Sequence, residues 1–215
     1  MTAPRRIFLS VWLTADLLAL AFVGACLALV APLLLPQDSE AAHRLPNNGH
    51  WTTGSWSIGH YTVADWTGSN WPVYASQIKW DEGARYSAAY VNGGSSCPAP
   101  CVTARSKFPN EDPNFDWNCN VYGYTGNLVV AGGNHFTEDM YIRFNRACSD
   151  SSGSDLSDYQ RRGVTCHELG HALGLNHRDP DYKDSCMRGD PAPALNTPDA
   201  HDYNLLNGSI YDHSG

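Results

Sequence analysis

The hydrophobic pattern along the chain predicts several short β-strands. Met140, Ile142 and Phe144 alternate with more polar neighbours, which is the pattern of a strand with one buried face. Three shorter runs, rich in aromatic, β-branched or small residues, indicate further strands. These runs are 61–65, 86–91 and 101–105. Residues 106–127 are rich in Pro, Asn, Asp and Gly, so we expect a loop there.

Two segments in the same region have the features of helices. The first is expected to begin at Pro72 and to end at Gly83, and its apolar residues recur at helical spacing. This apolar stripe consists of Trp71, Tyr74, Ala75 and Ile78. Ser157 and Gln160 form a capping box, which predicts a second, longer helix that reaches about Gly174.

The order of these elements predicts one α+β domain. Most strands come before the long helix, and a last short helix is expected at 199–206, so strands and helices are grouped apart. The 215 residues are enough for one domain with a substantial core and too few for two. We assign residues 59–215 to this domain. Residues 42–58 are polar and rich in Gly, Asn and Trp, and are expected to be a linker or an N-terminal arm.

Residues 1–41 form a hydrophobic leader. Arg5 and Arg6 precede a long apolar run, which is the charge pattern of a secretory signal peptide or a signal anchor. The run is longer than the ~7–15 residues of a cleaved signal and is close to the ~20 residues that span a bilayer. Lipidation at Cys26 is a third option. We expect a protein that is secreted, or held at the membrane only by this segment, with its catalytic domain outside.

Charge and cysteine content narrow the classes of function. The net charge is −8, and no large cluster of Lys and Arg is present, so a nucleic-acid partner is not expected. Six cysteines lie outside the leader: Cys97, Cys101, Cys119, Cys148, Cys166 and Cys186. An even number suits three disulfides in an oxidising compartment. A structural zinc site of four cysteines is the competing interpretation, but only Cys97 and Cys101 form a close pair.

The chemistry is concentrated in the segment 166–177, with the sequence CHELGHALGLNH. On a helix, His167 and His171 are one turn apart and project from the same face, so both can bind one metal ion. Glu168 is beside the first ligand and can act as general base. Gly174 can adopt a positive φ, end the helix and let the chain return with His177 as third ligand. Three protein ligands leave a fourth position for water, as in catalytic zinc sites.

This pattern, H-E-x-x-H-x-x-G-x-x-H, resembles that of the metzincin metalloproteases, and the chain looks most similar to small secreted matrixin-like peptidases. The resemblance implies a mixed twisted sheet, a long active-site helix, a Met-turn and a C-terminal helix. It also implies that Met187 is the methionine of the Met-turn and forms a hydrophobic floor under the metal. Because the Met-turn lies beneath the metal helix in that family, a Cys166–Cys186 disulfide is expected. The pairs Cys97–Cys101 and Cys119–Cys148 would then remain.

The departures from the family are also informative. Residues 42–58 are too short for a propeptide with a cysteine switch, and no tyrosine ligand follows Met187 closely. Gly132–His135 does not match the structural-metal segment of matrixins, so no second zinc is assigned. Residues 150–158 are expected to be a solvated loop and helix cap. Calcium bound to their oxygens is an alternative that nothing else in the sequence supports.

These observations predict a zinc-dependent endopeptidase with one catalytic Zn²⁺. Peptide bonds would be hydrolysed by a metal-bound water, assisted by Glu168 as general base. The expected partner is a protein or peptide substrate, and the expected state is a monomer. Two alternatives remain: a metallohydrolase that acts on a non-peptide amide, and a zinc-binding module without activity. The intact Glu168 argues against the second alternative.

Overall fold

The computed structural model describes most of the chain after residue 59. The described ranges are 60–84, 87–93, 97–98, 100–126, 130–131, 135–136, 139–149, 156–178, 184–189 and 195–210. The predicted leader 1–41, the predicted arm 42–58 and residues 150–155 of the expected loop lie outside these ranges. No helix in the described part of the chain is long and apolar enough to cross a membrane.

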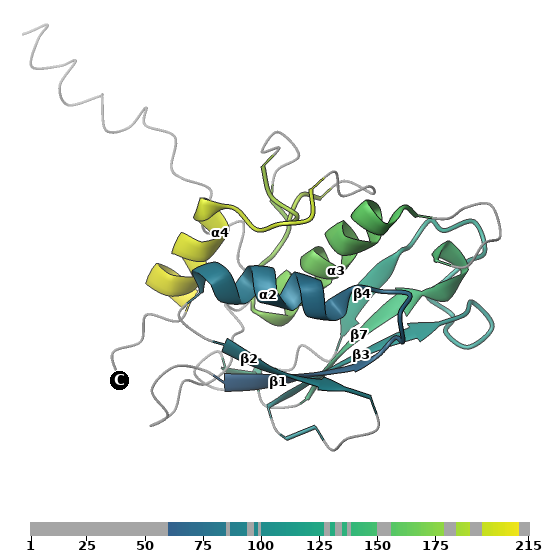
Figure 1. Cartoon of the computed structure of the whole chain (residues 1–215), viewed down its shortest axis with the longest axis horizontal. Coiled ribbons are helices and arrows are strands. Elements are labelled where there is room, and N and C mark those ends of the chain that lie inside the picture. Colours follow the sequence, from purple (N-terminus) through teal and green to yellow (C-terminus); the bar gives the residue numbers. More distant parts are fainter. Residues whose placement is uncertain are drawn as a thin grey trace, which may run out of the picture. The chain divides into compact units, whose positions relative to one another are not determined.

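A five-stranded sheet forms the centre of the domain (Figure 1). Its strands, from one edge to the other, are β2 (Ser87–Asn92), β1 (His60–Trp66), β3 (Cys101–Lys107), β7 (Met140–Asn145) and β4 (Gly123–Gly126). The first four are mutually parallel, and β4 runs antiparallel to β7. The sheet is therefore mixed, as expected. A separate ribbon pairs β5 (Val130–Ala131) with β6 (His135–Phe136).

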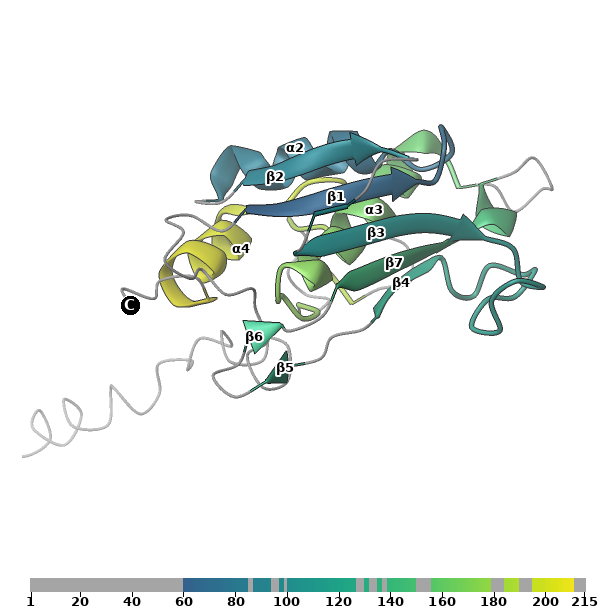
Figure 2. The same cartoon turned by 90° about the horizontal axis from the view of Figure 1, so that it is seen from below.

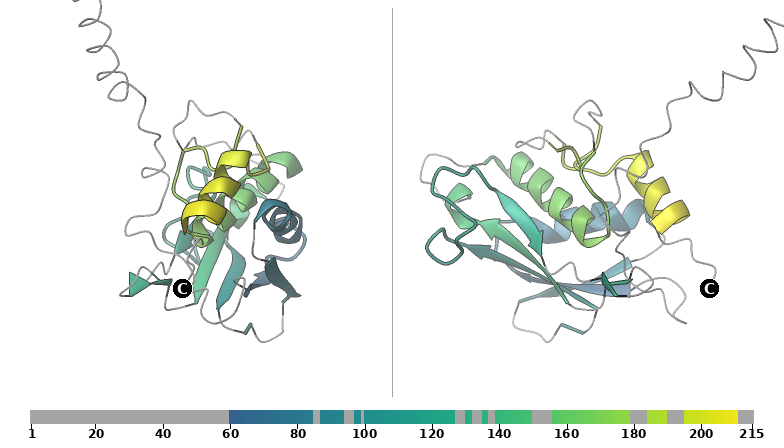
Figure 3. Two further views of the ribbon diagram at one scale, coloured as in Figure 1. Left: turned by 90° about the vertical axis from the view of Figure 1, so that its left-hand side faces the viewer. Right: turned by 180° about the vertical axis from the view of Figure 1, so that it is seen from behind.

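The helices lie on one face of this sheet (Figures 1 and 3). They are α2 (Val73–Gly83), α3 (Asp158–Ala172) and α4 (Ala200–Leu205), and α4 continues into the π-helical turn η5 (Leu206–Ile210). A short 3₁₀ turn, η4 (Arg146–Cys148), follows β7. From below, the strands are seen with the helices behind them (Figure 2). Strands and helices form two layers, in agreement with the predicted α+β class.

The core lies between the two layers. Met140, Ile142 and Phe144 are all buried, which confirms the alternation predicted for β7. The ring of Phe144 stacks on Trp71, with 4.6 Å between ring centroids. This stack ties the centre of the sheet to the start of α2, where the chain crosses from β1 to the helical layer.

The buried face of α2 differs from the predicted one. Tyr74 is 54% exposed and Ile78 is 38% exposed, whereas the buried residues are Val73, Ser76, Gln77 and Trp80. Packing against α3 decides this: Ser76 Oγ donates to Arg162 O at 3.2 Å, and Trp80 Nε1 donates to Cys166 O at 3.0 Å. The small side chain of Ser76 lets α2 and α3 pack closely, and the hydrogen bond of the Trp80 indole N–H allows that ring to be buried between them.

The prediction of a loop over 106–127 is also partly wrong. β3 extends to Lys107, and β4 forms at Gly123–Gly126 inside the expected loop. A strand that contains two glycines has little intrinsic β propensity, so its formation depends on pairing with β7.

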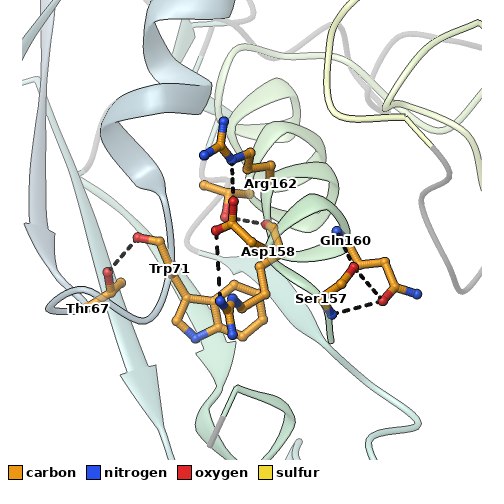
Figure 4. A network of polar contacts seen from close by, with 8 residues as sticks. Thr67, Trp71, Ser157, Asp158, Gln160 and Arg162 are labelled. Carbon is orange, nitrogen blue, oxygen red and sulfur yellow. Dashed lines mark hydrogen bonds and ion pairs between the residues drawn. The ribbon is translucent and has the colours of Figure 1, made fainter. Parts of the chain in front are cut away.

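The ends of α3 agree with the sequence. The Ser157 hydroxyl accepts from the Gln160 N–H at 3.3 Å, and the Gln160 side chain accepts from the Ser157 N–H at 3.0 Å (Figure 4). The predicted capping box is therefore formed. At the other end the helix stops at Ala172, and Gly174 has a φ of +101°, as expected for a residue that ends a helix sharply. The predicted last helix is α4, with Asp199 as its N-cap.

All three expected disulfides are present: Cys97–Cys101, Cys119–Cys148 and Cys166–Cys186. The last joins α3 to the segment that contains Met187. The alternative of a four-cysteine zinc site is therefore wrong, because none of these six sulfur atoms is a free thiolate.

Candidate metal centre

His167 and His171 project from the same face of α3, one turn apart. Their Nε2 atoms are 3.1 Å apart, and their rings are nearly perpendicular, with 4.6 Å between centroids. The two nitrogens therefore point at a common position in front of the helix, as the spacing predicted.

Gly174 brings the third histidine to this position. Leu175 N donates to Gly170 O at 3.0 Å, which closes the turn after the helix and reverses the chain. His177 Nε2 then lies 3.1 Å from His167 Nε2. One nitrogen from each of the three rings lies within 4.8 Å of the others, so this group could hold a metal ion. Within the described ranges, no other group of His, Cys, Asp and Glu has this arrangement.

Backbone carbonyls orient two of the three imidazoles. His167 Nδ1 lies 2.8 Å from Cys186 O, and His171 Nδ1 lies 2.7 Å from Leu175 O. A carbonyl oxygen can only accept, so each Nδ1 must carry the hydrogen and donate it. The lone pair of each ring is then on Nε2, the atom that faces the common position. A hydrogen bond from the ring nitrogen that does not face the metal is typical of metal-binding histidines.

Met187 is fully buried beneath the helix that carries the histidines. Its backbone is held on both sides: Met187 N donates to Ser185 Oγ at 2.9 Å, and Met187 O accepts from Arg178 N at 2.8 Å. Arg178 directly follows His177, so the same pairing positions the third histidine. The side chain packs against Gly170, the residue before His171.

Glu168 lies on the adjacent side of α3 and is only 5% exposed. Burial raises the pKa of its carboxyl to about 7, and the hydroxyl of Thr125, 2.8 Å from Oε2, opposes that shift. Thr125 Oγ1 is also 2.9 Å from Glu168 O, so β4 and α3 are joined at this point. A metal ion at the histidines would favour the ionised carboxylate.

Thr125 was not identified from the sequence, because it belongs to the segment that was expected to be a loop. Hydrophobic periodicity gives no signal for a four-residue strand with two glycines. That Thr125 faces α3 can be inferred only once its pairing with Ile142 on β7 is known.

A cleft of about 250 Å³ opens in front of His167, Glu168 and His177. Its remaining walls come from the approach to β4, from α3 and from the residues after Met187. They are Asn120, Val121, Tyr122, Gly123, Val164, Arg188 and Gly189. The four residues predicted as metal ligands and base are thus brought together at one end of the sheet. Residues 150–155 and 132–134, where additional metals were considered, lie outside the described part of the chain.

Comparison with known proteins identifies no family. No protein-family profile matches the sequence, and no curated protein matches it. A solved structure of myroilysin is similar with a TM-score of 0.40 and 16% sequence identity, over 81% of this chain and 84% of that chain. A crystal structure of myroilysin has a TM-score of 0.36 and 15% identity, over 83% of this chain and 97% of that chain. Similarity at this level does not establish a shared fold.

Proposed function

We propose that the chain is a zinc-dependent endopeptidase, in which His167, His171 and His177 hold one Zn²⁺ and Glu168 is the general base. The observation that carries this proposal is the convergence of three imidazole nitrogens beside a buried carboxylate, at the wall of a cleft.

The donor set fits zinc. Imidazole nitrogen is a common zinc ligand, and three protein ligands are the number found in catalytic sites, where a fourth position takes water or substrate. Hydrogen bonds to Cys186 O and Leu175 O fix the tautomers of two rings in the metal-binding form. None of the three histidine side chains has to move far to bind the metal, since their nitrogens already lie close together.

Bound zinc supplies a Lewis acid that lowers the pKa of water and polarises a carbonyl group. Glu168 accepts a proton from the attacking water and passes it to the leaving amine. A carboxylate with a raised proton affinity suits both steps, and the Thr125 hydroxyl holds Oε2 in place for them. The protein therefore contributes a positioned base and an arrangement of imidazoles that requires little reorganisation.

The position of β4 supports a peptide as substrate. Among the described strands, β4 has a neighbour on one side only, and it ends the sheet beside the histidine cluster. A Cβ on Gly123 would lie 3.2 Å from Glu168 Cγ, so the strand directly borders the base. An extended peptide paired with the outer edge of β4 would pass through the cleft, as in β-augmentation. A small non-peptide amide would make no use of this edge.

The proposal includes an extracytoplasmic site of action. Three disulfides fit an oxidising compartment. We infer that the leader 1–41 exports the protein or anchors it, and that the domain acts as a monomer on protein or peptide substrates, without nucleic acid.

Hydrolysis of casein by the purified domain tests the proposal. We expect cleavage within the chain, loss of cleavage on treatment with a zinc chelator, and recovery when Zn²⁺ is added back. Zinc bound without any turnover would favour the inactive module. Turnover of small amides, with casein left intact, would favour the non-peptide metallohydrolase.

A further inference from the structure

Figure 2 shows the face of the sheet that the helices leave uncovered. The strand register places a row of arginine and aromatic residues across this face. The strand register places Trp66 beside Arg105, Arg105 beside Arg143, and Arg143 beside Tyr124. These four residues come from β1, β3, β7 and β4 in spatial order. At ~4.8 Å between neighbouring strands, the row is about 14 Å long.

Alternation along the strands fixes which face carries the row. Ala104 and Ile142, the residues just before the two arginines, are fully buried against the helical layer. Arg105 and Arg143 therefore project to the opposite face. Trp66 is 41% exposed, and Tyr124 and Arg143 are partly exposed. The row is accessible along its length in the part of the chain that the structure describes.

The two arginines are held beside each other without a carboxylate between them. In the described part of the chain, neither guanidinium lies within salt-bridge distance of an acidic group. Burial lowers the pKa of Arg143, and the charge of Arg105 adds to this shift, whereas Tyr124, Tyr141 and Asp112 oppose it. The carboxylate that raises the pKa of Arg143 is Asp112, which accepts hydrogen bonds from Tyr124 and Asn114. Two like charges side by side in a sheet are unfavourable for folding.

Aromatic rings hold both guanidiniums in place. Arg105 Cζ lies 4.9 Å from the centroid of the Trp66 ring, and Arg143 Cζ lies 4.5 Å from that of Tyr141. A guanidinium that stacks on a ring keeps its N–H edges free for planar, bidentate acceptors such as carboxylates. Arg143 Nη1 also donates to Ile142 O at 3.4 Å. The row thus presents two oriented guanidiniums between the rings of Trp66 and Tyr124.

We propose that Trp66, Arg105, Arg143 and Tyr124 form a docking surface for an acidic peptide segment of a protein partner. The arginines would bind two carboxylates of that segment, and the two aromatic rings would pack against its flanking side chains. Charge complementarity carries this choice: the surface has two adjacent cations with no carboxylate within salt-bridge distance in the described part of the chain, and the chain has a net charge of −8. That net charge opposes an extended polyanion such as RNA or an acidic polysaccharide. Trp, Tyr and Arg are also the residues enriched at the energetic centres of protein interfaces.

This surface is separate from the proposed active site. His167 and His171 lie on α3, in the helical layer, and His177 lies beside them after the turn, whereas the row lies on the other face of the sheet. Tyr124 and Thr125 are neighbours on β4 and project to opposite faces, the second toward Glu168. A partner bound to the row therefore leaves the cleft open, and its binding does not depend on zinc or on proteolysis.

Fluorescence anisotropy with the full chain and a labelled glutamate-rich peptide tests the proposal. The matching probe has glutamine in place of each glutamate. We expect the glutamate peptide to bind, and the double variant Arg105→Gln/Arg143→Gln to bind it at least about tenfold more weakly. The variant Arg162→Gln, which removes an arginine from the helical layer, should bind like the wild type. Unchanged circular dichroism and casein hydrolysis, with a melting temperature no lower than that of the wild type, would show that the fold of the double variant is intact.

Three results would overturn the proposal: no binding of the glutamate peptide, equal binding of the glutamine peptide, or equal affinity in the double variant. Polyuridylate RNA and polygalacturonate serve as alternative probes. Tighter binding of either one than of the glutamate peptide would also overturn it. Because the assay measures binding, it gives the same answer whether or not the chain is a protease.

Discussion

Gly170 and Met187 are in direct contact beside the cluster of His167, His171 and His177. A Cβ placed on Gly170 would lie 2.2 Å from Met187 Sδ and 2.8 Å from Trp80 Cζ2. The helix therefore approaches the buried thioether through a position that has no side chain. Gly170 lies between His167 and His171 on α3, so this contact determines how far the two histidines lie from Met187.

Gly170→Ala is expected to destabilise the protein through overpacking of this contact. Met187 and Trp80 are both fully buried, so neither side chain can move aside easily. We expect a loss of about 1–3 kcal/mol in the free energy of unfolding, measured by denaturant titration of the zinc-bound protein. Gly208→Ala is the control, since no atom lies within 4 Å of a Cβ at that position. Equal stability of the two variants would show that the contact is loose.

His177→Ala is expected to weaken zinc binding strongly while leaving the fold intact. The variant removes one of three converging nitrogens. Changes outside the ligand shell commonly cost 10–100-fold in metal affinity, so loss of a ligand should cost more than about 100-fold. Competition with a chromophoric chelator measures the affinity. His201→Ala, which removes an imidazole from α4, should bind zinc like the wild type; unchanged zinc affinity in His177→Ala would exclude His177 as a ligand.

The arrangement of the three histidines was far more predictable from the sequence than the sheet beside them. Two histidines one turn apart, followed by Gly174 and His177, have one simple geometric solution on a helix. In contrast, the two errors in the fold came from positions where tertiary contacts decide. Trp80 and Ser76 are buried on α2 because α3 offers Cys166 O and Arg162 O as hydrogen-bond acceptors. No pattern within α2 itself contains that information.

The strand β4 illustrates the same limit. Its sequence, GYTG, has a weak strand propensity, so the strand forms only because it pairs with β7. Thr125, which bonds the proposed base, was therefore missed. Similarly, Gly170 stands at a position that the motif leaves open, and no sequence pattern identifies the partner that requires a glycine there. Met187 becomes that partner only after the chain has turned and paired Arg178 with the segment 186–189.

Glu168→Gln is expected to keep zinc and lose nearly all activity. The amide has almost the same shape as the carboxyl group and can accept the hydrogen bond from Thr125, but it cannot take a proton from water. We expect a fall in kcat of about 10²–10⁴-fold, the usual contribution of a general base, with zinc content unchanged. Initial rates of casein cleavage and zinc analysis of the same sample provide the two readings. Turnover close to that of the wild type would remove Glu168 from the mechanism.

Removal of the Cys166–Cys186 disulfide is expected to destabilise the domain and its metal site together. The bond closes a loop with a sequence separation of 20, which corresponds to about 3 kcal/mol in the chain-entropy model. Cys186 O also accepts the hydrogen bond of His167 Nδ1. The double variant Cys166→Ser/Cys186→Ser should therefore unfold more easily and release zinc faster.

The matched control is Cys97→Ser/Cys101→Ser. Its loop has a sequence separation of 4, so the same model gives about 2 kcal/mol. The structure shows no contact of Cys97 or Cys101 with the three histidines among the interactions of the described residues, and zinc release from this variant should match that of the wild type. Equal rates of zinc release from both double variants would show that the Cys166–Cys186 bond does not help to retain zinc.

Asp202 is expected to support the metal site from outside it, through Ser185. The carboxylate is fully buried and accepts hydrogen bonds from Ser185 Oγ and from Asp199 N. Ser185 Oγ in turn accepts from Met187 N at 2.9 Å, so α4 is linked to the residue beneath the histidines. Asp202→Ala would leave one buried donor, Ser185 Oγ, and one partly buried donor, Asp199 N, without this acceptor. A fully buried donor left without a partner costs about 1–3 kcal/mol.

We therefore expect Asp202→Ala to lower the free energy of unfolding by about 2–4 kcal/mol. Zinc should also dissociate faster, because the turn that holds Met187 loses its anchor on α4. Asn204→Ala, an exposed substitution on the same helix, is the control and should change neither quantity. Denaturant titration and stopped-flow transfer of zinc to a chelator give the two measurements. A variant that is less stable but releases zinc at the wild-type rate would confine Asp202 to the capping of α4, and the link through Ser185 to Met187 would then play no part in holding the metal.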